Sequence, residues 1–170
     1  MTLWYNRPGG EKVRELLAEL ARMADRLTEL FEELSHWECL WKPDPAAWNC
    51  MGHLAHVVDI ELVYSVRIRS ALAEPGRRHE SFDADAWVES QAAMERMPED
   101  LMESFAQLRR WNLNLFASLS EAQWEQPFLH SERGPQTLAQ IANGLLAHDA
   151  QHLLELGRLS ELAREARQVD

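Results

Sequence analysis

Apolar residues recur at steps of three and four along the first long segment of the chain, residues 11–38. The positions on this seam are Val13, Leu16, Leu20, Met23, Leu27, Leu30 and Leu34. Charged side chains occupy the opposite positions, so the segment predicts an amphipathic helix with one buried face. Pro43 and Pro45 follow it, and proline lacks an amide donor and disfavours helix in the residue before it.

The second segment, residues 50–72, is apolar nearly all round and ends before Pro75-Gly76. Such a helix is buried on several sides, so we expect it to lie centrally in a bundle or partly in an oligomer interface. Asn49 is the predicted N-cap, because its side chain can accept a hydrogen bond from an amide of the first turn.

Three more helices are expected after a polar stretch that is typical of a loop. A short helix covers residues 86–96, with Asp85 as its N-cap, and Pro98 begins a longer one. The inward side chains of the longer helix are Leu101, Phe105, Leu108, Leu115 and Leu119, with Trp111 close by. Thr137 and Gln140 have the spacing of a capping box for a last helix over residues 138–167. No β pattern is evident, so the prediction is an all-α bundle of four main helices with a short additional one.

Length and charge limit the number of domains and the kinds of partner that this protein can have. A chain of 170 residues suits one domain over residues 1–170. Its net charge of −11 would repel a phosphate backbone, which argues against nucleic acid as a partner. No leader pattern or membrane-spanning stretch is present, so we expect a cytoplasmic protein without a membrane partner. Cys39 and Cys50 are expected to be free thiols in the core.

Histidines supply the candidate chemistry. His148 and His152 lie one turn apart on the inward stripe of the last helix, where they can bind a single metal ion. A third imidazole must come from elsewhere, and His53 and His56 on the second helix both qualify. An isolated histidine pair of this spacing is more often part of a core, but candidate ligands on a second buried helix strengthen the metal hypothesis. The remaining histidines, His36, His79 and His130, are expected to be exposed to solvent.

Other metal sites agree less well with the sequence. A carboxylate-bridged di-iron bundle needs two Glu-x-x-His motifs, and only Glu33 to His36 has that spacing, on the polar side of its helix. A zinc protease places a glutamate after the first histidine as general base. Here Asp149 follows His148, and its side chain is one methylene shorter.

Two stretches of the chain resemble the DinB-like metalloprotein superfamily. The run from Trp48 to Glu61 (WNCMGHLAHVVDIE), continuing to Arg67, is similar to the family's W-S-x-x-E-x-L-x-H-L-x-D-x-E…R segment. The runs GPQTL (134–138) and HDAQH (148–152) are similar to its G-x-x-T-L and H-D-x-x-H motifs. The chain departs from the pattern at Asn49, where serine is usual, and at Gly52, where glutamate is usual; neither position is a ligand.

The resemblance implies a four-helix bundle of unusual connection order that forms a homodimer and holds a divalent ion on three histidines. Register against Trp48 selects His56 rather than His53, so the implied ligands are His56, His148 and His152. Zinc or nickel is the first expectation for the ion, with iron or manganese as alternatives. Some members of the family are transferases or isomerases that use a low-molecular-weight thiol and an electrophile.

The leading hypothesis is therefore a metal-dependent enzyme that activates a thiol, as a transferase does, or water, as a hydrolase does. Asp59 and Asp149 are candidates for hydrogen-bonding the imidazoles from behind. The alternative is a non-catalytic, stress-related binding or interaction bundle whose metal is structural or vestigial. His53 is the residue that could complete such a closed site as an extra ligand. A sensor that binds a small molecule without turnover is a third hypothesis.

Overall fold

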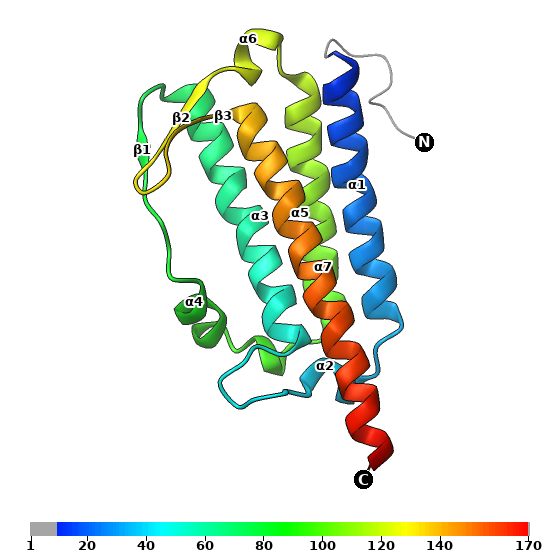
Figure 1. Cartoon of the computed structure of the whole chain (residues 1–170). Coiled ribbons are helices and arrows are strands. Elements are labelled where there is room, and N and C mark those ends of the chain that lie inside the picture. Colours follow the sequence, from blue (N-terminus) through cyan, green and yellow to red (C-terminus); the bar gives the residue numbers. More distant parts are fainter. Residues whose placement is uncertain (1–9, 170) are drawn as a thin grey trace.

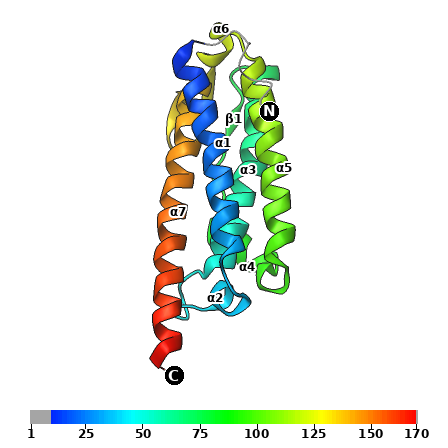
Figure 2. The ribbon, with the colours of Figure 1, turned by 90° about the vertical axis from the view of Figure 1, so that its right-hand side faces the viewer.

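Four long helices lie side by side in a computed structural model that describes residues 10–169 (Figure 1). They are α1 (Glu11–Glu32), α3 (Cys50–Ala73), α5 (Pro98–Ser118) and α7 (Leu138–Val169). Helix α1 packs against α5 and α7, and α3 packs against the same two helices, so α1 and α3 lie on opposite corners of the bundle. Figure 2 shows α1 from the outside, flanked by α5 and α7.

The connections between these helices differ from those of an up-and-down bundle. Helices α3 and α5 are neighbours and run in the same direction, so the chain between them returns along the length of the bundle (Figure 1). Short antiparallel connections cannot produce this order. The predicted all-α fold with four main helices and an unusual connection order is confirmed.

The end of helix α1 differs from the prediction for a local reason. Helix α1 ends at Glu32 rather than at residue 38, and Ser35 starts the short helix α2 (His36–Leu40). Ser35 forms a capping box in which its backbone amide donates to Glu38 Oε2 at 2.7 Å. The apolar repeat continues to Leu34, beyond the end of the helix. The break between the two helices is marked only by the cap at Ser35, which is a single side chain that an apolar repeat does not reveal. His36 is exposed, as predicted.

The segment predicted as a helix over residues 86–96 is also divided. Helix α4 (Ala84–Ser90) begins two residues earlier, because Asp83 rather than Asp85 accepts from the amide of Ala86, at 3.1 Å. Ala92 then has a positive φ of 50°, and a short 3₁₀ helix, η1 (Ala93–Glu95), follows. The predicted Asn49 cap of α3 and the Thr137–Gln140 capping box of α7 are confirmed.

A small sheet corrects the expectation that the chain contains no strands. Strand β2 (Pro127–His130) pairs in parallel with β1 (Arg78–His79) and antiparallel with β3 (Gly134–Thr137), with α6 (Glu121–Trp124) just before it. Strands this short cannot show the alternating pattern that reveals a strand in a sequence. The sheet buries His79 and His130, so the prediction that both are exposed is wrong. The ring of His79 stacks on Phe128 with 4.6 Å between the ring centres.

The core fills the space between the four helices, and most predicted inward positions lie in it. Leu101 and Phe105 on α5 and Leu119, its C-cap, are buried, whereas Trp111 is 54% exposed. Cys39 and Cys50 are buried free thiols, as predicted. Burial raises the pKa of the Cys50 thiol to about 12, so it is not a nucleophile at neutral pH. No helix among residues 10–169 has the length and apolar character needed to cross a bilayer.

Glycines in the long helices offer a test of local packing. A Cβ at Gly52 would lie 3.2 Å from the Cβ of Trp48, whereas one at Gly144 or Gly157 would meet no atom within 4 Å. Alanine is favoured over glycine inside a helix by about 0.5–1 kcal/mol. We therefore expect Gly144→Ala and Gly157→Ala to raise the free energy of unfolding, measured by urea denaturation, by about that amount. Gly52→Ala should lower it, because Trp48 must move; a gain equal to that of Gly144→Ala would contradict this contact.

Candidate metal centre

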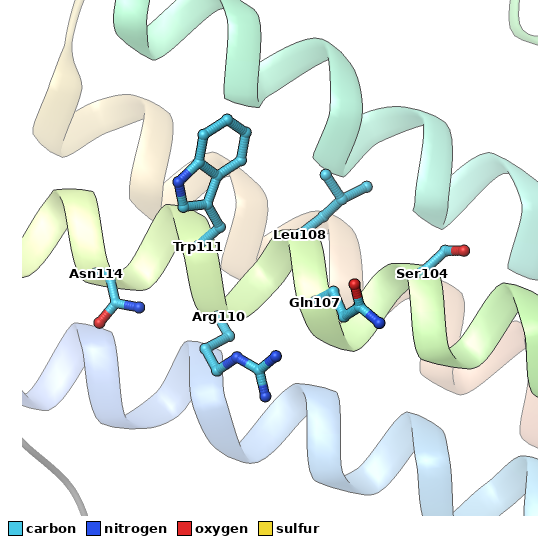
Figure 3. Close-up of a pocket in the computed structure, with 6 residues that line it drawn as sticks. All are labelled: Ser104, Gln107, Leu108, Arg110, Trp111 and Asn114. Carbon is cyan, nitrogen blue, oxygen red and sulfur yellow. The ribbon is translucent and has the colours of Figure 1, made fainter.

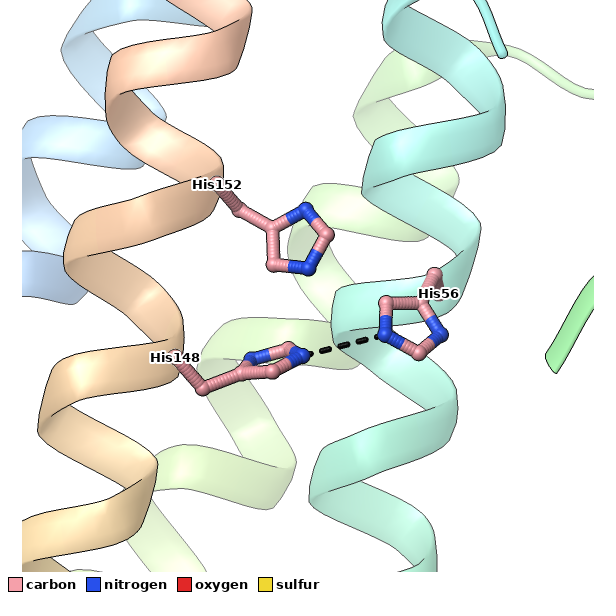
Figure 4. Close-up of side chains that lie close together, drawn as sticks. All are labelled: His56, His148 and His152. Carbon is pink, nitrogen blue, oxygen red and sulfur yellow. Dashed lines mark hydrogen bonds between the residues drawn. The ribbon is translucent and has the colours of Figure 1, made fainter. Parts of the chain in front are cut away.

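Three histidines from two helices converge between α3 and α7. His56 comes from α3, and His148 and His152 come from successive turns of α7 (Figure 4). The Nε2 atoms of His56 and His148 lie 3.0 Å apart. One nitrogen from each of the three rings lies within 4.8 Å of the others. The structure thus brings together the three residues that the resemblance selects as ligands.

Local sequence explains why these rings face one another. His148 and His152 continue the stripe of buried side chains that includes Leu145 and Leu156, so the packing of α7 against the bundle turns them inward. His56 lies in the second turn of α3, with its ring centre 5.1 Å from that of Trp48. Because Gly52 has no side chain, Trp48 can lie against the first turn of α3 and cover this side of the cluster.

Burial keeps two of these imidazoles neutral. The pKa of His56 is lowered to about 4, mainly by desolvation, with the nearby rings of His148 and His53 acting in the same direction. The pKa of His152 is lowered to about 3, again mainly by desolvation, together with the neighbouring imidazoles. At neutral pH both rings therefore carry a free lone pair, which is the form that binds metal ions.

The donor set suits a divalent ion. Zinc binds imidazole nitrogen at about 2.0–2.1 Å, so two ligands of a tetrahedral ion lie about 3.3–3.4 Å apart. The 3.0 Å separation of two Nε2 atoms and the 4.8 Å limit on all three rings bracket this value. Three neutral imidazoles leave the charge of the ion uncompensated and leave a coordination position for another ligand. The residues present therefore fit a catalytic type of site.

Three other candidates lie around the cluster. The Nδ1 atom of His53 is 3.0 Å from the Nδ1 atom of His152. Asp59 is buried, which raises its pKa, and its Oδ2 accepts a hydrogen bond from Gln91 at 2.8 Å. Asp149 is buried as well, and its Oδ1 lies 4.0 Å from Nδ1 of His148. That distance exceeds a hydrogen bond, so direct orientation of His148 by Asp149 stays a prediction.

Asp149 instead belongs to a buried ion-pair network that sequence reasoning did not find. Arg109 is 2% exposed, and its guanidinium lies 2.7 Å from Asp149 and 2.6 Å from Glu61. It also donates to the backbone carbonyl of Leu20 at 2.9 Å, and Asn112 donates to Glu61 at 2.8 Å. Although burial alone lowers the pKa of Arg109, the two carboxylates raise it on balance, so it stays charged.

This network joins all four long helices, and its residue on α7, Asp149, lies between His148 and His152 in the sequence. Arg109 of α5 contacts α1 through Leu20, α3 through Glu61 and α7 through Asp149. Because Asp149 is adjacent to His148, the network fixes the rotation of α7 that aims His148 at His56. A carboxylate in an otherwise apolar stripe, as at Glu61 and Asp149, was the signal that could have revealed it.

Several hollows lie outside the histidine cluster. An apolar one of about 430 Å³ is lined by Leu62, Val63, Val66, Arg67, His79, Glu80, Phe82 and Trp87. Phe82 also approaches the metal centre, with its ring centre 6.4 Å from that of His56. A second, of about 540 Å³, is lined by α5 side chains alone, among them Trp111 and Arg110 (Figure 3). None of its lining residues comes from α3 or α7, the helices that carry the three histidines.

Several known proteins are similar to this chain. A protein of Bacillus cereus named "Putative metal-dependent hydrolase" is 27% identical over 153 residues, covering 87% of this chain and 85% of its own. A protein of Oceanobacillus iheyensis with the same type of name is 23% identical and covers 86% and 84% of the two chains. The structure of YfiT from Bacillus subtilis, described as "a probable metal-dependent hydrolase with an unusual four-helix bundle topology", superposes with a TM-score of 0.84. It covers 92% of this chain and 90% of its own at 17% identity, and so shows the same fold.

The family itself is shown by the sequence. The DinB superfamily matches residues 19–156, which include the histidine cluster, the Arg109 network and the sheet. The resemblance seen in the motifs around Trp48 and His148 is confirmed. This chain belongs to the DinB superfamily.

Proposed function

We propose that this protein is a metal-dependent enzyme in which His56, His148 and His152 hold a divalent ion, zinc or nickel. The observation that carries the proposal is the convergence of three imidazole rings on one point between α3 and α7, two of which, His56 and His152, are kept neutral by burial. The names of the relatives, which include metal-dependent hydrolases, support it.

The bound ion would supply a Lewis acid that lowers the pKa of a thiol or water in its open position. The chain's own residues shape the surroundings of that position. Trp48 and Phe82, whose ring centres are 5.1 Å and 6.4 Å from that of His56, exclude water from its flanks. The apolar hollow beyond Phe82 offers space for the body of a small electrophile or ester.

Hydrolysis and thiol transfer are the two reactions that this site suits. Both need an anionic nucleophile at neutral pH, and they differ in whether water or a low-molecular-weight thiol supplies it. The names of the relatives favour hydrolysis. The buried Cys39 and Cys50 have raised pKa values, so a thiol nucleophile would have to come from a small molecule.

Removal and return of the metal tests the proposal. Protein stripped with a chelator should lose hydrolysis of aryl esters, or transfer of a small thiol to an aryl halide, and one equivalent of zinc or nickel should restore it. The same treatment of a His56→Ala variant should restore nothing, because a ligand is missing. Equal rates with and without metal would refute the proposal. Full metal occupancy without either reaction would favour the non-catalytic binding or sensor alternative.

We also propose that the protein is a cytoplasmic homodimer. Leu62 and Val66 on α3 are 48% and 62% exposed, although this helix is apolar nearly all round. A second copy covering these side chains would remove them from water and would form an outer wall of the apolar hollow that they line. Two free cysteines are typical of a reducing compartment, and the net charge of −11 disfavours nucleic acid. A particle mass twice that of the chain in light scattering would support the dimer.

A further inference from the structure

His53 is a histidine of this chain that lies beside the metal centre without facing its middle. It comes one turn before His56 on α3, and its Nδ1 atom lies 3.0 Å from Nδ1 of His152. The contact uses only one of the two ring nitrogens of His152. Its other nitrogen, Nε2, is left to point toward His56 and His148 (Figure 4).

This contact and the proposed metal site together determine which ring nitrogens carry protons. A neutral imidazole that gives the Nε2 lone pair to a metal carries its proton on Nδ1. His152 therefore donates from Nδ1, and Nδ1 of His53 accepts. His53 must then carry its own proton on Nε2. Either ring could donate in this short contact, but only the arrangement in which His152 donates leaves His152 Nε2 free for the ion.

His53 is itself held in place. Its ring meets the ring of Trp48 edge to face, with 5.4 Å between the ring centres and 77° between the planes. The other two cluster histidines, unlike His152, have no hydrogen-bond partner on Nδ1 within residues 10–169. The Nδ1 atoms of His56 and His148 are buried without a hydrogen-bond partner, and Asp149 stays 4.0 Å from the latter.

We propose that His53 is a positioning residue for the metal centre, holding the ring of His152 so that Nε2 faces the ion. This inference rests on the proposed metal site and makes it more specific. Since Nδ1 of His53 is engaged with His152, His53 does not complete the ion's coordination as a fourth ligand. The fourth position remains open to substrate, as a catalytic site requires.

A matched pair of substitutions tests the role. Asparagine and leucine have nearly the same shape, but only asparagine offers an oxygen close to where Nδ1 lies. We expect His53→Leu to weaken zinc binding, measured by competition with a chromogenic chelator, by about 10- to 100-fold, the usual effect of losing such a partner. His53→Asn should retain most of the affinity. The visible spectrum of the Co²⁺ form should be the same in His53→Asn as in the unchanged protein, because the ligand set is unaltered.

Each outcome separates this inference from the proposed function. Equal zinc affinity of His53→Leu and the unchanged protein would overturn the positioning role and leave the metal site standing. A Co²⁺ spectrum altered in His53→Asn would identify His53 as a ligand and likewise overturn it. Failure of the unchanged protein to bind zinc would overturn the metal site and this inference together. Melting temperatures of the metal-free variants establish that both are folded.

Discussion

Replacing His148 by alanine is expected to abolish stoichiometric binding of a divalent ion while the protein remains folded. The remaining rings, His56 and His152, come from different helices and cannot by themselves complete a three-coordinate protein site. His148 is the most suitable of the three for this test, because its side chain is 23% exposed and its loss leaves no large cavity in the core. Metal content after dialysis against a trace of zinc, measured by mass spectrometry, gives the result.

His36→Ala is the matched control. His36 is an exposed histidine at the start of α2 and lies outside the cluster, so its loss should leave the metal content unchanged. If His148→Ala retained as much metal as His36→Ala, the assignment of the site would be wrong. Circular dichroism of both variants would establish that they keep the helical fold.

The second large effect is a loss of stability when Arg109 is replaced. In Arg109→Met the side chain keeps an unbranched apolar stem but loses the charged guanidinium, which leaves the carboxylates of Glu61 and Asp149 buried, at 0% and 1% exposure, without their cation. Breaking a buried ion pair by removing one partner costs about 3–5 kcal/mol. We expect the free energy of unfolding from urea titration to fall by about that amount.

An exposed ion pair provides the comparison. Arg22 and Glu19 form a pair on the surface of α1, with side chains 53% and 43% exposed. Arg22→Ala should change the free energy of unfolding far less than Arg109→Met, because solvent screens such pairs. If Arg109→Met does not fold, Glu61→Gln keeps the shape of that side chain and removes one charge, and it should give a measurable partial loss. Equal effects of Arg109→Met and Arg22→Ala would contradict a stabilising role for the network.

The long helices and the metal-binding stripe could be predicted because both depend on periodicity. The apolar repeat locates α3 and α7 nearly to the residue, and the stripe from Leu145 to Leu156 shows that His148 and His152 face inward. The residues alone left His53 and His56 as equal candidates for the third ligand. Only the register of the family motif chose His56, and the structure then placed that ring opposite His148.

Other features depend on contacts between distant segments and could not be read from local pattern. His79 and His130 looked like polar loop residues, yet pairing of β1 with β2 buries both. Arg109 precedes Arg110 in a polar part of α5, and only its meeting with Glu61 and Asp149 makes it a core residue. The end of α1 was missed because Ser35 and Glu38 form their cap within a sequence whose apolar repeat continues.

The separation of His56 from His148 by 92 residues has a consequence for how the protein folds. The site cannot form until α7, the last helix, docks against α3, and closing so long a loop has an entropic cost that local helix formation does not bear. A metal ion held by these histidines therefore could not act as an early template, and it would bind a chain whose topology is already established. Such an ion would act as a reversible crosslink between the two helices, and its concentration would set how strongly the folded state is favoured over the unfolded one.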